Sequence, residues 1–145
     1  MSGALIDAAR AVSANAHAPY SGFGVGAAVL LSDGSIVTGC NFENASYGMT
    51  LCAESVALAT VNAQGKLREV REIAVIGGAL KDGVISGSDP VRPCGRCRQI
   101  IHEAATLSAT DLLIHCASAD GHHVEAHRIS DLLPFAFGPA DLGLL

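Results

Sequence analysis

The sequence predicts an α/β fold in which a mixed five-stranded sheet has helices packed on its faces. Some segments repeat apolar residues with a helical period, and others are short, β-branched apolar runs. The two kinds of segment alternate along the chain, and Asp-Gly pairs between neighbouring runs indicate hairpins. The expected order is helix, hairpin, helix, strand, helix, hairpin, helix.

The N-terminal part begins with a helix followed by a hairpin. Residues 3–16 place apolar side chains on one helical face, and Pro19 ends this helix or follows it closely. Residues 25–31 and 36–40 are predicted strands joined by a short Asp-Gly turn. The polar segment 41–48 is then expected to be a loop.

The middle of the chain alternates helix and strand. Residues 51–64 are predicted to form a helix with Gly65 at its C-cap. The β-branched segment 73–77 predicts a central strand that is covered on both faces. A loop rich in Gly, Ser and Asp follows over residues 78–92. Pro93 suits the first position of the next helix, which runs to about residue 105.

The C-terminal part contains the last hairpin. Residues 111–116 and 122–127 are predicted strands, and their short Asp-Gly connection makes them antiparallel, since a parallel pair needs a long crossover. Ser130 is expected to cap a short closing helix that Pro134 terminates. No repeat, linker or low-complexity tract interrupts residues 1–145, so we expect a single domain.

Charge and composition narrow the function classes. Nine Lys and Arg are outnumbered by fourteen Asp and Glu, which gives a formal net charge of −5, whereas nucleic-acid binders need a basic surface. Aromatic residues make up only 4% of the chain, so bases would find few side chains to stack on. Arg92, Arg96 and Arg98 cluster, but the balance favours a small-molecule substrate and no nucleic acid.

The hydrophobic pattern predicts neither a membrane partner nor secretion. No apolar run approaches the ~18 residues that span a bilayer. The first residues lack the basic and apolar regions of a signal peptide, so we expect a cytoplasmic protein. Half of the residues are apolar, which indicates either buried subunit interfaces or a well-filled core. Composition does not choose between the two.

The five cysteines indicate a metal site or a catalytic thiol, because their number is odd and no leader directs the chain to an oxidising compartment. Cys52 lies at one predicted helix start. Cys94 and Cys97 lie at the next, three residues apart and therefore on one helix face. Helix starts favour thiolates, and two helices that follow adjacent strands start at the same sheet edge. The pattern predicts a zinc site with three protein ligands and an open fourth position.

Glu54 lies two residues beyond the first of these cysteines. It is too close in sequence to share the metal easily, but near enough to reach water at the open position. A metal ligand, one residue, a Glu and then Pro-Cys-x-x-Cys is the layout of zinc deaminases, in which the Glu transfers protons and does not bind the metal.

Two other interpretations of the cysteines stay open at this point. Cys94 and Cys97 could be a thioredoxin-like redox pair, although that leaves the segment from Cys52 to Glu54 unexplained. A structural zinc site is the other alternative, and it needs a fourth ligand. The candidates for that ligand are Cys40, Cys116 and His102.

Four segments in the same order resemble those of the homotetrameric cytidine deaminases, and together they span nearly the whole chain. They are residues 18–28 (APYSGFGVGAA), 39–48 (GCNFENASYG), 93–99 (PCGRCRQ) and 132–139 (LLPFAFGP). The resemblance implies a three-layer α/β/α fold, one Zn²⁺ per chain, a nucleoside substrate, and composite active sites in a homotetramer.

The resemblance also implies roles for individual residues. Cys52, Cys94 and Cys97 would bind zinc, and Glu54 would be the catalytic acid and base. Asn41 and Glu43 would hold the ribose hydroxyls, which an amide and a carboxylate can share. Phe23 would pack on the pyrimidine, and the backbone carbonyl of Ala53 would accept a hydrogen bond from the exocyclic amine. The residues that would reach a neighbouring subunit's pocket are Ala45, Tyr47 and Phe137. Plain core packing is the alternative for Phe23 and Phe137.

The implied reaction is the hydrolysis of cytidine or deoxycytidine to uridine or deoxyuridine and ammonia, in pyrimidine salvage. Zinc lowers the pKa of water toward ~7. Glu54 would accept the proton of that water, pass it to ring nitrogen N3 and then help to protonate the leaving amine. The sequence does not rank the two nucleosides.

Two residues depart from the family pattern. The family usually has Arg directly after the catalytic Glu, where this chain has Ser55, and a smaller aliphatic residue at the place of Phe42. With three thiolates the zinc site carries negative charge, and Arg96, Arg98 or the helix dipoles are left to compensate it. Blasticidin deaminases also lack that Arg. A deaminase of an antibiotic nucleoside therefore stays open as an alternative function, as does a non-catalytic zinc protein.

Overall fold

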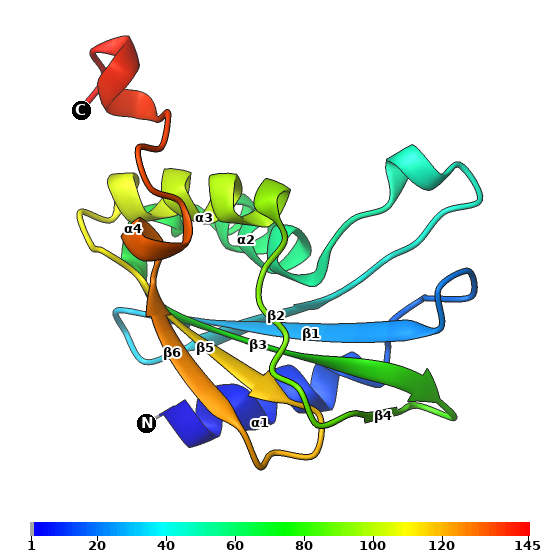
Figure 1. The fold of residues 1–145 in the computed structure, drawn as a ribbon. Helices are drawn as coiled ribbons and strands as arrows, with labels where there is room; N and C mark the ends of the chain where they lie inside the picture. Colours follow the sequence, from blue (N-terminus) through cyan, green and yellow to red (C-terminus); the bar gives the residue numbers. More distant parts are fainter. Residues whose placement is uncertain (1) are drawn as a thin grey trace.

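The computed structural model describes residues 2–145 and has three layers (Figure 1). The central layer is a sheet. Helix α1 (Ser2–Ser13) covers one face, and helices α2 (Ala53–Ala63) and α3 (Gly95–Leu107) lie side by side on the other. This is the predicted α/β/α architecture, and it puts the starts of α2 and α3 on the same side of the sheet.

The sheet has the strand order β2-β1-β3-β5-β6. Its strands are β1 (Phe23–Leu31), β2 (Ile36–Cys40), β3 (Val70–Lys81), β5 (Leu113–Ser118) and β6 (Val124–Arg128). Among the strands of residues 2–145, only β3 and β5 pair in parallel, and the connection between them is the crossover that contains α3. The last two strands, β5 and β6, are antiparallel as predicted.

A sixth short strand, β4 (Val84–Ser86), was not predicted. The expected loop over residues 78–92 is wrong at its start, because β3 continues to Lys81 and β4 turns back to pair with it. Asp82 and Gly83 form the turn and both have positive φ, which two-residue hairpins require. The same Asp-Gly signal that predicted the other hairpins was present here. Ile85 is buried beneath α1, so the extra strand completes the core on that face.

Three predicted helix boundaries are also corrected by the backbone. Helix α1 ends at Ser13 because the chain turns and the backbone of His17 pairs with residues 41–43. Helix α4 (Ile129–Leu132) begins before Ser130, whose hydroxyl donates to Asp111 and does not cap it. Pro93 lies before α3 and outside it. In contrast, Gly65 follows the end of α2 with a positive φ of 74°, as expected of a glycine that ends a helix.

Short 3₁₀ turns and two projecting segments complete the chain. The turns are η1 (Tyr47–Met49), η2 (Leu67–Glu69) and η3 (Pro139–Leu142). The loop that contains η1 and the C-terminal segment that ends in η3 both extend away from the layered body (Figure 1). Among residues 2–145, no helix combines the length and the apolar character that crossing a membrane requires.

Core residues lie on both faces of the sheet. On the face covered by α2 and α3, a glycine lets a helix and a strand approach each other most closely. Strand β2 passes under α2 at Gly39, where an added Cβ would lie 2.5 Å from the backbone nitrogen of Ala57 and 2.7 Å from the carbonyl oxygen of Ala53. Backbone atoms cannot rotate away as a side chain can. The absence of a Cβ at this position therefore fixes how closely α2, and with it Glu54, sits on the sheet.

We expect Gly39→Ala to lower the free energy of unfolding by roughly 1–3 kcal/mol, because the helix must move to admit the methyl group. Chemical denaturation followed by circular dichroism measures this change. Gly48→Ala is the matched control, since a Cβ there meets nothing within 4 Å. Equal stability of the two variants would contradict the close packing of α2 on β2.

Candidate metal centre

The candidate site is built from the first residues of α2 and α3. Cys52 and Cys94 are the N-cap residues of these helices, with extended backbone conformations (φ −76°, ψ 155° and φ −66°, ψ 168°). Cys97 lies in the first turn of α3. The free N–H groups and positive dipole ends of both helices therefore face the same space, which stabilises negative charge on sulfur.

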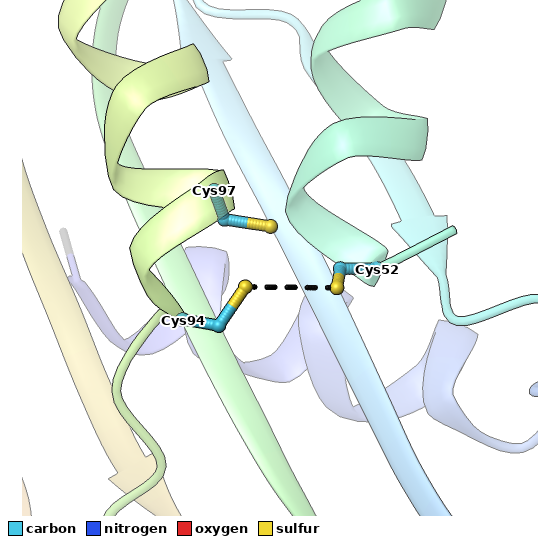
Figure 2. A group of neighbouring side chains, drawn as sticks. All are labelled: Cys52, Cys94 and Cys97. Carbon is cyan, nitrogen blue, oxygen red and sulfur yellow. Dashed lines mark hydrogen bonds between the residues drawn. The ribbon is translucent and has the colours of Figure 1, made fainter. Parts of the chain in front are cut away.

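The three sulfur atoms converge in the way a zinc ion requires. Figure 2 shows the side chains of Cys52, Cys94 and Cys97 pointing toward one another from the two helix starts. All three sulfurs lie within 4.8 Å of one another, and the Cys52 and Cys94 sulfurs are 3.7 Å apart. Two sulfurs bound at about 2.3 Å to one tetrahedral zinc lie about 3.8 Å apart. The Cys52–Cys94 separation thus already fits a shared zinc ion, and the Cys97 sulfur lies close enough to be the third ligand.

The alternative of a structural, four-ligand zinc site does not fit this geometry. Within residues 2–145, the only group of three or more candidate ligands that converges is the three-cysteine cluster. Cys40, Cys116 and His102 are not part of it. A redox pair would need two of the three sulfurs and gives no reason for the third to be there. The cluster has the ligand number of a catalytic site.

Burial controls the protonation of the side chains at this centre. Glu54 is only 4% exposed, and burial raises the pKa of its carboxyl group, although the neighbouring Cys97 thiol acts in the opposite direction. Burial likewise raises the pKa of the Cys52 and Cys97 thiols. At Cys94 burial is outweighed by the backbone N–H of Cys97 and the two neighbouring thiols, which lower the pKa of its thiol. Metal binding must therefore displace protons from sulfur.

A cavity of about 170 Å³ opens beside the cluster. It is lined by Val25, Asn41, Thr50, Cys52, Ala53, Glu54, Val91, Arg92 and Cys94. Thus Glu54, Ala53 and two of the three cysteines border one cavity. Drug-sized ligand sites span about 300–1,000 Å³, so this cavity has room for only part of a ligand of that size.

Asn41 lies at the wall of this cavity with its side chain held in place. Its amide nitrogen donates to the carbonyl oxygen of Phe23 at 2.8 Å, and its side-chain oxygen accepts from the backbone N–H of Val25 at 2.9 Å. One N–H and one lone pair of the amide are left over. Asn41 therefore fixes the start of β1 and keeps hydrogen-bonding capacity toward the cavity.

Glu43 lies two residues after Asn41 and is buried. Its carboxylate holds the segment before β1 in place. One carboxylate oxygen accepts from the backbone N–H groups of Tyr20 and Ser21 at 3.0 and 3.1 Å. The other accepts from the hydroxyl of Ser21, and this bond lowers the pKa of the Glu43 carboxyl. Glu43 is thus an ionised, preorganised acceptor next to Asn41.

Neither Glu43 nor the remaining predicted substrate contacts line the cavity. Phe23, Ala45, Tyr47 and Phe137 are all exposed, with Tyr47 74% and Phe137 61% accessible. Tyr47 contacts Tyr20 edge to face at a centroid distance of 5.6 Å. The side-chain nitrogen of Gln99 donates a hydrogen bond to the backbone carbonyl oxygen of Phe137 at 2.7 Å. In a single chain these side chains point to solvent.

Two arginines beside the centre donate to backbone carbonyls and not to a sulfur. Arg96 donates to the carbonyl of Thr50 at 3.4 Å, and Arg98 donates to the carbonyls of Pro93 and Leu132. They fix the chain on either side of the cysteines. Arg96 and Arg98 therefore do not compensate the negative charge of the thiolates through direct hydrogen bonds to them.

Arg92 and the hydrophobic walls of the cavity were missed from the sequence. Arg92 is held by a bidentate ion pair with Glu125 on β6, at 2.8 and 2.6 Å. Its position next to the Pro-Cys-x-x-Cys segment was the available signal. No signal in the sequence marked Val25 or Val91 as site residues, because apolar residues on a strand and in a loop are equally consistent with core packing.

The second departure from the family pattern, Phe42, does not reach the cavity. Its side chain is 54% exposed and packs edge-on against the His17 ring at 5.9 Å. Asn41 and Glu43 point inward on either side of it, as alternation along an extended chain requires. Phe42 therefore gives no structural reason for a changed pocket.

Comparisons with known proteins agree with this geometry. A sequence model of the zinc-binding region of cytidine and deoxycytidylate deaminases matches residues 2–110, which include the three cysteines and Glu54. A cytidine deaminase of Mycobacterium tuberculosis is 44% identical over 92% of this chain and 87% of its own. Another, from Halalkalibacterium halodurans, is 40% identical over 95% of both chains. The crystal structure of cytidine deaminase from Burkholderia pseudomallei has a TM-score of 0.82 at 41% identity, over 94% of this chain and 99% of that one.

Proposed function

The chain belongs to the cytidine deaminase family, and we propose that Cys52, Cys94 and Cys97 hold its zinc ion while Glu54 transfers protons in the deamination of cytidine. The enzyme is a zinc-dependent hydrolase that converts cytidine and water to uridine and ammonia. The observation that supports the residue assignment best is the convergence of three sulfurs beside a buried carboxyl group.

Zinc, when bound, supplies a Lewis acid that activates water for attack at neutral pH. Glu54 lies on the wall of the same cavity, and burial raises the pKa of its carboxyl group. A carboxyl group with a raised pKa is a better proton carrier near neutral pH. We assign it two proton relays: it first carries a proton from the attacking water to N3 of the base, and it then carries the proton of the hydroxyl group now on C4 to the amine that leaves.

The base and the ribose are assigned to different parts of the site. The cavity accepts the pyrimidine, with the carbonyl of Ala53 as acceptor for the exocyclic amine. Asn41 and Glu43 hold the ribose hydroxyls, because both are fixed by backbone hydrogen bonds and Asn41 lies at the cavity wall. We extend the substrate range to deoxycytidine, and we assign the enzyme to pyrimidine salvage in the cytoplasm.

We assign a homotetramer in which a neighbouring chain completes each site. The cavity in one chain is too small for a whole nucleoside, and the residues that are to cover it project outward. Ala45, Tyr47 and Phe137 lie on the two segments that extend from the body (Figure 1), and Phe23 is the exposed first residue of β1. Light scattering coupled to size exclusion should give the mass of four chains, whereas the mass of one chain would contradict the composite site.

An ultraviolet assay tests the function directly. The purified, zinc-loaded protein is mixed separately with cytidine, deoxycytidine and blasticidin S, and absorbance and ammonia are followed. We expect cytidine to lose absorbance as uridine and ammonia form in equal amounts. Turnover of the antibiotic alone, or zinc binding with no turnover, would contradict the proposal. Nothing in the fold or in the comparisons favours those two alternatives.

A further inference from the structure

We propose that Ser55 is a positioning residue of the zinc centre, whose hydroxyl donates a hydrogen bond to the Cys97 sulfur and so sets the electron density that this thiolate gives to the metal. The inference rests on the proposed function, since it assumes that Cys97 is a zinc ligand.

The contact itself is direct and buried. The Ser55 Oγ lies 3.3 Å from the Cys97 Sγ, across the interface between the first turns of α2 and α3. Ser55 is 8% exposed and Cys97 is fully buried, so water cannot easily replace the hydroxyl. Either atom could be the donor when both carry hydrogen. A zinc-bound cysteine is a thiolate without a proton, so the Ser55 hydroxyl must then be the donor.

The charge at the centre explains why this bond matters. Three thiolates and one Zn²⁺ carry a net charge of about −1, and Glu54 lies in the same cavity. The nearby Arg96 and Arg98 donate to backbone carbonyls. Over residues 2–145, the Ser55 hydroxyl is the one side-chain hydroxyl or cationic group found in hydrogen-bonding distance of the three sulfurs.

A hydrogen bond to a thiolate lowers the energy of the sulfur lone pairs and reduces their donation to the metal. Partners of this kind, outside the ligand set, typically change metal affinity or activity by about 10–100-fold when removed. Without the Ser55 hydroxyl, Cys97 would be a buried thiolate with one fewer stabilising partner. The sulfur should then give an electron to a metal more readily. Zinc should also leave faster, because the hydrogen bond that holds the Cys97 side chain in its ligand orientation is gone.

Cobalt substitution and zinc release test this without relying on activity. In the Co²⁺-loaded full-length protein, we expect Ser55→Ala to move the thiolate-to-cobalt charge-transfer band to longer wavelength. We expect zinc transfer to a colorimetric chelator to be about tenfold faster. Ser55→Thr should behave as the parent, since it keeps the hydroxyl and the residue borders a groove between α2 and α3 with room for a methyl group.

Ser13→Ala is the matched control. Ser13 is also a buried helical serine, but its hydroxyl donates to the carbonyl of Arg10 on the opposite face of the sheet. A Ser55→Ala protein whose band and zinc release match those of Ser13→Ala would overturn the inference. If Ser55→Ala does not fold, Ser55→Gly takes its place, because it also removes the hydroxyl and adds no metal ligand. An unchanged charge-transfer band in that replacement variant would also overturn the inference.

The parent protein separates this inference from the proposed function. A parent that takes up no cobalt, or that shows no thiolate band, overturns both. A parent that shows the band and deaminates cytidine, beside a Ser55→Ala variant with unaltered metal properties, leaves the deaminase intact and removes only the role of Ser55.

Discussion

Glu54→Gln should abolish most of the deaminase activity while leaving the zinc site and the fold intact. Amide replaces carboxyl at nearly the same volume, so the cavity keeps its shape, but the side chain can no longer accept and return a proton. Loss of a general acid and base typically costs about 10²–10⁴-fold in rate. Because burial raises the pKa of the Glu54 carboxyl, exchange for a neutral amide also relieves the cost of a buried charge. The free energy of unfolding should therefore not fall.

Three measurements on Glu54→Gln decide the role of the carboxyl group. They are kcat on cytidine, zinc content by elemental analysis, and stability in denaturant. Glu103→Gln, an exposed substitution on α3, serves as the control and should keep parental values. A Glu54→Gln protein that purifies without zinc would make Glu54 a ligand. One that retains full activity would remove it from the proton transfers.

Cys94→Ala should lower the zinc content well below one ion per chain. Structural zinc sites with four ligands are worth about 10–16 kcal/mol, so an equal share is about 2.5–4 kcal/mol for each ligand. That share corresponds to a loss of affinity on the order of 10²–10³-fold. The variant should fold, because Cys94 is exposed and contributes little to the core. Activity should disappear in proportion to the missing metal.

Cys40→Ala is the matched control for this experiment. Cys40 is a partly buried free cysteine at the end of β2, and burial raises the pKa of its thiol. It lies outside the cluster of three sulfurs, so its removal should leave zinc binding unchanged. Full zinc occupancy in Cys94→Ala would remove this residue from the site. Equal zinc loss in both variants would indicate a general effect of unfolding.

Much of the fold could be predicted because its signals are local. Helix and strand periods, the β5–β6 hairpin and Gly65 at the end of α2 each depend on a few neighbouring residues. Strand β4 was missed although its Asp82-Gly83 turn has the usual composition, because the surrounding Gly and Ser residues suggested a loop. Boundaries such as the end of α1 depend on pairing with a distant segment, here at His17, and no local pattern encodes that pairing.

The sequence by itself determined which residues are available for zinc chemistry, since the spacing of Cys52, Glu54, Cys94 and Cys97 is a property of the chain. Only the tertiary structure decided how far apart they lie. The 3.7 Å between two sulfurs and the Ser55–Cys97 contact both cross from one helix to another. Such distances depend on how closely α2 and α3 pack on the sheet, which a missing Cβ at Gly39 permits. Packing results from many long-range contacts. A sequence motif can therefore identify the ligands of a metal but not the distances between their atoms.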